Sequence, residues 1–494
     1  MPNWYEDLCA LFKDKIGKGE MAGTAYDTAW VASIPDPEHP DRPAFPQTLE
    51  WLRLHQHSDG SWGATIEYYH DRIISTLTAC IVLAEWHSDP WADYQIEAGL
   101  RSIWRNVANM QRDPYEPVGF DLIVPTLLDR AEALGLRLPY RHFDAYRTRR
   151  QHKLTMIPPH LLYSRFVPTT YSLEFMGDQV DATRLNGDLQ ESNGSIGASP
   201  SATSYFFDRT KESRALAYIG NVVRSVRGGI PCTAPIEAFE QAWCLYNLYL
   251  VDEKIPPEGQ PIVDSLALSW TDQGVAFSSS YSIPDLDDTA LVFAALARSG
   301  HSLDPAVFHE YEADDHFRCF RYERDASRSA HAHLLESLAK CPPTVDRQKM
   351  IDKAVSFLRQ SQVAGTFWFD KWHASPYYTT AHTIIAALDI APELVSGAIE
   401  WIIQTQRPDG AWGYLSGTTE ETAYGLQALV FYRRRGGSVP SDVLQQAANY
   451  LIHSADLQHV HYEAQWIAKV LFSPTWVVHS SVLGALAMHE RLGE

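Results

Sequence analysis

Apolar residues along this chain recur with the period of an α-helix rather than with the alternation of a β-strand. The long apolar stretches 119–138 and 443–452 fit a period of 3.6 residues, and segments 1–17 and 237–250 also predict helices. The Gly- and Pro-containing stretch 228–231 is the best candidate for a domain boundary. The pattern therefore predicts an all-α protein.

A loop that joins glycine to an aromatic residue recurs along the chain, and each copy precedes an apolar helix. Three copies lead to a Thr-Ala pair, at Thr289-Ala290, Thr380-Ala381 and Thr422-Ala423. A fuller phrase, Gln-x-x-Asp-Gly-x-Trp-Gly, occupies 56–63 and 406–413. Its Gln and Asp can hydrogen-bond the turn while the Trp packs on the neighbouring helix. Such repeats are typical of stacked helical hairpins, so we expect an α/α toroid whose inner helices point their N-termini at one cavity.

Three acidic residues, Asp285, Asp287 and Asp288, stand just before the apolar run 291–296. This position is the first turn of a predicted helix, where carboxylates cap free N–H groups and meet the positive end of the helix dipole. Capping alone would explain them. Crowded carboxyls also cannot all ionise, so one proton stays in such a cluster. The residues alone leave both Asp287 and Asp288 open as a proton donor.

Composition narrows the class of protein. The 494 residues allow two domains of ordinary size or three small ones. A net charge of -20 disfavours nucleic acid and anionic membranes as partners. No apolar run is long enough to span a bilayer, the N-terminus lacks the apolar core of a signal peptide, and the six cysteines are scattered. We expect a cytoplasmic protein with reduced thiols.

The string Asp285-Leu-Asp287-Asp288-Thr-Ala290 matches the D-x-D-D-T-A signature of class II terpene cyclases, and the two Asp-Gly-x-Trp-Gly phrases resemble their QW motifs. Further matching strings lie at 26–30, 193–202, 239–243, 370–378 and 466–471. The ensemble most resembles the bacterial diterpene members that make copalyl-, halimadienyl- or clerodienyl-type diphosphates.

This resemblance implies two α-barrels, called β and γ, with the active site between them. The β domain would comprise its first helix, 1–19, and residues 236–494, and the γ domain would be inserted as residues 20–235. The implied reaction is proton-initiated cyclisation of geranylgeranyl diphosphate to a bicyclic diterpenyl diphosphate, with the diphosphate retained. The family assigns proton donation to the middle carboxyl, here Asp287, with Asp285 and Asp288 as its partners.

The other site residues also come from the resemblance. An aromatic cavity would stabilise carbocations through ring faces, and its candidates are Phe277, Tyr281, Trp368, Tyr377, Tyr378 and Trp476, although each taken singly fits core packing as well. Candidate contacts to the diphosphate are Lys153, Lys371 and Lys469. The family's acidic magnesium motif is reduced here to Asp113 and Glu116, so we expect Mg²⁺ as cofactor with few protein ligands.

Other functions remain open at this stage. One alternative is a sesquiterpene (drimenyl-type) or meroterpenoid cyclase that acts on a farnesyl-type substrate, and another is a non-catalytic α/α toroid that binds a protein or lipid. Class I ionisation is not expected, because the string 314–318 departs from D-D-x-x-D at its last position. A downstream class I synthase or tailoring enzyme is the expected pathway partner. Possible final bases are His373, His382 and His479, each of which also fits a buried structural role.

Overall fold

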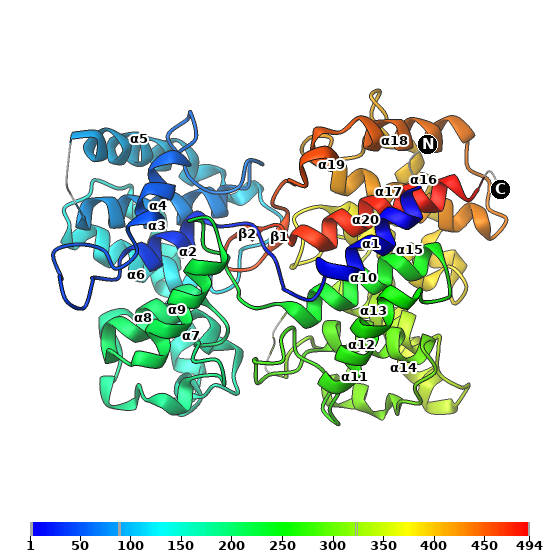
Figure 1. Ribbon diagram of the computed structural model, residues 1–494, viewed down its shortest axis with the longest axis horizontal. Helices are drawn as coiled ribbons and strands as arrows, with labels where there is room; N and C mark the ends of the chain where they lie inside the picture. The colour runs from blue at the N-terminus through cyan, green and yellow to red at the C-terminus, as the bar shows by residue number, and fades with distance from the viewer. Residues whose placement is uncertain (1–2, 87–89, 322, 324, 493–494) are drawn as a thin grey trace.

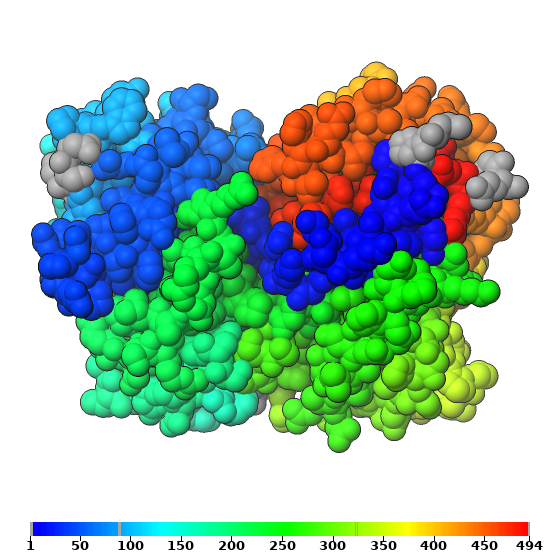
Figure 2. All heavy atoms as spheres, viewed as in Figure 1, coloured from blue at the N-terminus to red at the C-terminus, as the bar shows by residue number. Residues whose placement is uncertain are grey.

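Two α/α-barrels lie side by side in the computed structural model, and a short hairpin lies between them (Figure 1). The structure describes the whole chain except residues 1–2, 87–89, 322, 324 and 493–494. The space-filling view shows the same two lobes, with the N-terminal segment crossing from one lobe to the other (Figure 2). The predicted all-α architecture is confirmed.

The larger barrel has a closed ring of inner helices, in which each helix packs against the next and the last packs against the first. The inner helices are α10 (Glu237–Val251), α12 (Leu286–Arg298), α13 (Arg328–Leu338), α15 (Pro376–Ala387), α17 (Thr419–Arg434) and α20 (Thr475–Glu490). The outer helices are α1 (Trp4–Asp14), α11 (Gln260–Ser269), α14 (Val345–Ser361), α16 (Pro392–Gln404) and α18 (Ser441–His453). The first helix thus belongs to this barrel, where α1 packs along α20 (Figure 1).

The smaller barrel is built in the same way. Its inner elements are α2 (Ala25–Ala32), α4 (Tyr69–Glu85), α6 (Phe120–Ala133), the 3₁₀ segment η4 (Pro168–Gln179) and α8 (Pro200–Thr210). Its outer helices are α3 (Pro46–Leu54), α5 (Pro90–Asn106), α7 (Asp144–Met156) and α9 (Ser213–Ser225). The remaining short elements are η1 (Val107–Arg112), η2 (Tyr140–Phe143), η3 (Leu161–Tyr163), η5 (Ala182–Arg184), η6 (Gly187–Leu189), η7 (Pro257–Gly259), η8 (Pro305–Tyr311) and α19 (Ala455–His459).

The apolar pattern decides which helices are inside. Inner helix α20 is buried continuously from Trp476 to Met488, so this stretch has no face exposed to water. Outer helix α18 buries Leu444, Ala447, Ala448 and Leu451, whose spacing of three and four residues makes one apolar stripe. Outer helices can therefore cover the inner ring and still face water.

The repeated Trp loops join helix ends as predicted. Trp62, Trp368 and Trp412 are fully buried, and each indole Nε1 donates to the carbonyl oxygen of the residue ten positions earlier at 2.7 Å. The backbone N–H groups of Trp368 and Trp412 donate to the Oγ1 atoms of Thr380 and Thr422, which explains the threonine of the Thr-Ala pair.

Both full copies of the loop also require their glycine. Gly60 and Gly410 have φ angles of 89° and 88°. A Cβ at either position would lie 2.5 Å from a carbonyl oxygen, that of Ala98 or of Gln446. The two copies therefore have one geometry in two different barrels.

The hairpin between the barrels consists of β1 (Trp466–Ile467) and β2 (Leu471–Phe472), paired antiparallel. It belongs to the larger barrel in sequence but docks on the smaller one. Leu471 N donates to Asp71 Oδ1 of α4 at 2.9 Å, and Val118 N donates to the carbonyl oxygen of Ala468 at 2.8 Å. The inner helices α4 and α6 of the smaller barrel thus begin next to this hairpin.

Two main hydrophobic cores correspond to the two barrels. One contains residues of α1 together with residues from 238 onward, and the other contains residues 26–232 with Ala468 and Val470 of the hairpin. This distribution supports the division into 1–19 with 236–494 and 20–235, whose limits stay a prediction. Within the described residues, no helix is both long and apolar enough to cross a membrane.

Candidate active site

An apolar cavity with a volume of about 180 Å³ lies where the two barrels and the hairpin meet. Its lining comprises Met21, Val118, Pro168, Tyr171, Thr233, Ile236, Phe239, Trp243, Phe277, Tyr281, Asp285, Asp287, Asp288, Cys319, Phe320, Trp372, Trp466, Ile467, Ala468 and Phe472. Among these described lining residues there is no Lys or Arg. The lumen therefore suits a hydrocarbon chain rather than an anionic group.

All three aspartates of the motif face this cavity at the start of α12. Asp285 is the N-cap residue, and its carboxylate accepts from Asp288 N at 3.0 Å. The thiol of Cys319 lies 3.7 Å from Asp285 Oδ1, and Leu286 N donates to the carbonyl oxygen of Cys319. The helix start predicted from the sequence is confirmed, and it brings all three carboxyls to one point.

Burial changes the acidity of this cluster. It raises the pKa of Asp285 to about 7, and burial together with the neighbouring Asp285 carboxyl raises the pKa of Asp288 well above its ordinary range. Asp288 Oδ1 has no hydrogen-bond partner among the described residues and is inaccessible. Two neighbours that resist ionisation keep negative charge away from Asp287 before it gives up a proton.

Asp287 is held by a histidine pair that the sequence analysis did not connect to it. His333 Nδ1 lies 2.5 Å from Asp287 Oδ1, and His333 Nε2 lies 2.7 Å from His382 Nδ1. His333 is on α13 and His382 is on α15, so the chain of side chains crosses three adjacent inner helices. His333 stands 46 residues from Asp287, and no local motif marks it.

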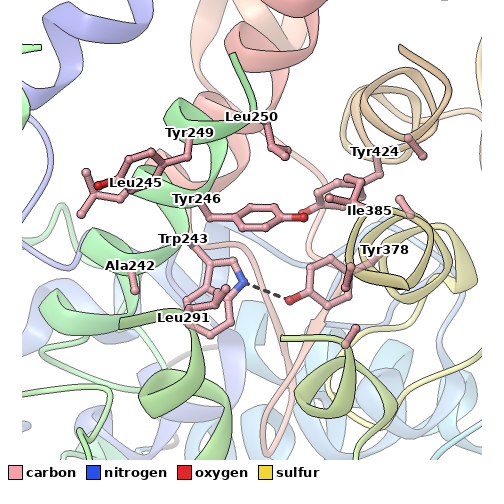
Figure 3. Packing of buried hydrophobic residues seen from close by; sticks show 14 of the residues in the cluster. Ala242, Trp243, Leu245, Tyr246, Tyr249, Leu250, Leu291, Tyr378, Ile385 and Tyr424 are labelled. Carbon is pink, nitrogen blue, oxygen red and sulfur yellow. Dashed lines mark hydrogen bonds between the residues drawn. The ribbon is translucent and has the colours of Figure 1, made fainter. Parts of the chain in front are cut away.

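Aromatic rings surround the histidine pair. Trp243 Nε1 donates to the hydroxyl oxygen of Tyr378 at 3.0 Å, which fixes the Trp243 ring as part of the cavity wall (Figure 3). Trp243 also packs edge-on against His333, with ring centroids 5.5 Å apart. Tyr246 stacks on His382 at 4.8 Å. The wall of the cavity and the support of Asp287 are therefore one packed unit.

Two of the predicted wall aromatics, Phe277 and Tyr281, line the cavity, stacked 4.3 Å apart. The other four lie outside the described lining: Trp368 is a loop tryptophan, Tyr377 stacks on Trp401, Tyr378 lies behind Trp243, and Trp476 donates to Glu20. The physical reason is that aromatic residues next to the family strings also fill the cores of the barrels. The wall rings that the sequence analysis did not single out are Tyr171, Phe239, Trp243, Phe320, Trp372, Trp466 and Phe472.

The three predicted lysines have different surroundings. Lys469 is fully buried, and its Nζ donates to Glu174, Ser199 and Ser201 and to the carbonyl oxygen of Tyr171, which does not fit a diphosphate contact. Lys371 pairs with Glu323 beside Trp372, and burial lowers its pKa to about 8. Lys153 pairs with Asp121 at 2.7 Å, and 39% of its side chain is exposed.

Asp113 and Glu116, the predicted magnesium ligands, are occupied by other partners. Asp113 accepts from Tyr69 N and His70 N at the start of α4, and His70 Nδ1 lies 2.7 Å from Asp113 Oδ2. Glu116 accepts from Arg149 at 2.7 Å. No cluster of three or more potential metal ligands occurs in the described part of the chain. These two residues do not fit a magnesium site.

The remaining candidate bases also have structural partners. His373 accepts from Ser375 N and lies 3.3 Å from Glu420, while His479 lies 2.6 Å from the hydroxyl of Tyr462. Neither of these histidines lines the cavity. Their alternative role as buried structural histidines therefore fits the geometry better.

Comparison with known proteins identifies the family of this chain. The squalene-hopene cyclase C-terminal domain family matches residues 324–429. A type B diterpene cyclase from Mycobacterium tuberculosis is 35% identical over 97% of each chain. A (-)-kolavenyl diphosphate synthase from Tripterygium wilfordii is 33% identical over 74% of this chain, and the chain spans only 45% of that plant protein.

Solved structures agree with this assignment. The ent-copalyl diphosphate synthase from Streptomyces platensis aligns over 98% of this chain and 99% of its own, with a TM-score of 0.80 and 27% identity. The ent-copalyl diphosphate synthase from Arabidopsis thaliana aligns over 98% of this chain and 63% of its own, with a TM-score of 0.74 and 25% identity. With its aspartate cluster facing an apolar cavity between two α/α-barrels, this chain belongs to the class II diterpene cyclases.

Proposed function

We propose that this protein cyclises geranylgeranyl diphosphate to a bicyclic diterpenyl diphosphate and that Asp287 is the proton donor. The observation that carries the proposal is the position of Asp287 between two neighbours of raised pKa. Its carboxyl faces an aromatic lumen with no lysine or arginine among the described residues that line it. Relatives named as diterpene cyclases and copalyl diphosphate synthases support the substrate class.

The first step is protonation of the terminal alkene. The alkene π electrons form a new C–H bond with the proton of Asp287, and the electrons of the O–H bond stay on the carboxylate. An alkene is a very weak base, so the donor must be a strong acid that is aimed at one carbon. The N-terminus of α12 and the ring of His333 next to Asp287 favour the carboxylate that remains.

The cavity then stabilises the carbocation and protects it from water. Ring faces such as those of Trp243, Trp372 and Trp466 stabilise positive charge and exclude water, which would otherwise quench the cation. Loss of a proton from carbon ends the reaction, so the product is an isomer of the substrate. The diphosphate takes no part in bond breaking, consistent with a lumen without lysine or arginine among its described lining residues.

The diphosphate would lie outside this apolar lumen. Of the three predicted lysines, Lys153 has the most exposed side chain, and we retain it as the proposed diphosphate contact. The expected partner remains a downstream enzyme that consumes the diterpenyl diphosphate. The six cysteines are free thiols, which supports the proposal that the enzyme works in the reducing cytoplasm.

The direct test offers the purified protein three substrates: geranylgeranyl diphosphate, farnesyl diphosphate and a geranylgeranylated aromatic without a diphosphate. Products are dephosphorylated where needed and identified by gas chromatography with mass spectrometry. We expect turnover of geranylgeranyl diphosphate to a bicyclic diterpenol after dephosphorylation. Preferred turnover of farnesyl diphosphate would replace the substrate assignment. Turnover of the aromatic substrate alone would also remove the role proposed for Lys153.

A further inference from the structure

His382 occupies a position that the cyclisation chemistry described above does not use. It does not line the cavity, yet its Nδ1 lies 2.7 Å from Nε2 of His333, whose other nitrogen meets Asp287 Oδ1 at 2.5 Å. The side chains of His333 and His382 are buried. The three groups therefore form an unbranched chain in which each contact holds one hydrogen.

The direction of the hydrogen bond between His382 and His333 determines the direction of the one between His333 and Asp287. If His382 Nδ1 carries hydrogen, it donates to Nε2 of His333, and a neutral His333 must then carry its own hydrogen on Nδ1. His333 donates to Asp287 Oδ1, and the acid hydrogen of Asp287 sits on Oδ2. In the opposite arrangement, the bare Nδ1 of His333 would accept the acid hydrogen and turn it away from the substrate.

We propose that His382 is a positioning residue that sets the tautomer of His333 and thereby keeps the transferable proton of Asp287 on Oδ2. The inference rests on the proposed role of Asp287 as the donor. Proton transfer to the alkene then leaves a carboxylate whose Oδ1 already accepts the N–H of His333. The two hydrogens that join His382 to His333 and His333 to Asp287 stay in place during this step.

The surroundings of His382 agree with a neutral ring that holds one hydrogen. Its ring packs among Tyr246, Tyr378 and Tyr424, with centroids 4.8, 4.4 and 5.8 Å away. Figure 3 shows these three tyrosine rings converging between the inner helices. Burial, followed by the nearby His333 and His373, holds the pKa of His382 well below its ordinary value.

Two substitutions separate hydrogen bonding from packing. His382→Leu fills similar space but removes the donor, whereas His382→Asn can place its amide N–H₂ where Nδ1 stands. We expect His382→Leu to lower kcat roughly 100-fold or more with KM changed less than about threefold, since positioned proton transfer contributes about 10²–10⁴. His382→Asn should keep kcat within about tenfold of the unchanged enzyme. Equal losses in both variants, or a His382→Leu enzyme within about threefold of the unchanged one, would overturn the proposal.

A spectroscopic measurement tests the tautomer itself. In protein labelled with ¹⁵N at histidine, the ring signals of His333 are identified by their absence in His333→Asn. We expect a hydrogen on Nδ1 and none on Nε2 of His333, and loss of this preference in His382→Leu. A hydrogen on Nε2 in the unchanged protein contradicts the proposal.

Asp287→Asn distinguishes failure of this inference from failure of the proposed function. If that variant keeps its turnover, Asp287 is not the donor and the proposed mechanism itself falls. If it is inactive while His382→Leu remains active, only the role of His382 is refuted. Thermal melting of all variants shows whether each one folds.

Discussion

Lys469 Nζ, between the strands of the hairpin, lies 2.7 Å from Glu174 Oε1 in the smaller barrel, and both side chains are fully buried. The same ammonium group donates to Ser199 at 2.6 Å and to Ser201, at the start of α8. The hairpin also carries Trp466 and Phe472 of the cavity wall. The anchor of Lys469 in the smaller barrel therefore fixes part of the wall contributed by the larger one.

Replacing Lys469 by Met should destabilise the protein strongly. The substitution leaves Glu174 as a buried carboxylate without its charged partner, and such a change costs about 3–5 kcal/mol. We expect a lower Tm together with a fall in kcat/KM, measured by calorimetry and by turnover. The control for stability is Lys153→Met: Asp121 is buried, but 39% of the Lys153 side chain is exposed, so water screens this pair in part and its loss should cost less than that of the Lys469 pair. Equal losses of stability in both variants would contradict a special role for the Lys469 anchor.

Asp287→Asn should abolish turnover while the fold remains. The amide is nearly the same size as the carboxyl but cannot supply a strong acid, so we expect kcat to fall by about 10² or more. Binding of an unreactive prenyl diphosphate analogue, followed by calorimetry, should change little. A variant that neither turns over nor binds the analogue would point to a structural effect instead. An Asp287→Asn enzyme that keeps its turnover would show that Asp287 is not the proton donor.

Activity should fall as the pH rises through about 7. Burial raises the pKa of Asp285 to about 7, above about 3.9 for a free aspartate, so Asp285 is protonated below pH 7 and ionised above it. Ionisation places a negative charge beside Asp287, where it opposes formation of a second carboxylate. The measurement is kcat against pH for the unchanged protein and for Asp285→Asn. We expect the decline near pH 7 to move or disappear in the variant; an identical profile would exclude Asp285 as its cause.

The raised pKa of Asp285 also predicts that the stability of the folded protein depends on pH. The folded-state pKa of Asp285 is raised, so its contribution to the free energy of unfolding is fully present below about pH 4 and is lost as the pH rises to about 7. Asp285→Asn should therefore flatten the change of Tm across this interval. The Tm of both proteins is measured from pH 4 to pH 8 in steps. An unchanged slope would contradict the assignment.

Asp113→Ala should act on folding rather than on metal binding. Asp113 accepts from two backbone N–H groups at the start of α4, and loss of such a cap costs about 0.5–2 kcal/mol. We expect a lower Tm with no change in the concentration of Mg²⁺ that gives half-maximal activity. Glu116→Ala, which removes only an exposed pair with Arg149, is the control and should keep its Tm. A shift of the Mg²⁺ requirement in either variant would restore these residues as ligands.

The aspartate motif is a feature whose local structure could be predicted from the sequence. The run of Asp285, Asp287 and Asp288 before an apolar segment indicated a helix start, because capping and the helix dipole act within one turn. The Trp loops behaved in the same way: Trp412 reaches a carbonyl ten residues away, so the whole motif is contained in one stretch of chain. The periodicity of apolar residues likewise predicted helices in 119–138 and 443–452, where the structure has α6 and α18.

The rest of the site depends on contacts between distant segments. His333 reaches Asp287 only because α12 and α13 are neighbours in the ring, and His382 joins them from α15. Trp368 and Trp372 are four residues apart in similar surroundings of sequence, yet one fills the core and the other lines the cavity. The residue type does not tell a core tryptophan from a cavity-wall tryptophan, since both positions favour an aromatic ring.

Lys469 shows most clearly the difference between what the sequence predicted and what the tertiary structure determined. Its sequence context suggested a diphosphate contact, whereas the structure places its ammonium group in the smaller barrel with Glu174. The sequence by itself determined the helices, their repeats and the aspartate cluster, because these depend on interactions within one or two turns. Only the tertiary structure decided which side chains support Asp287, which rings form the wall and which lysine stays partly exposed. The reason is that burial and pairing are set by segments tens to hundreds of residues apart.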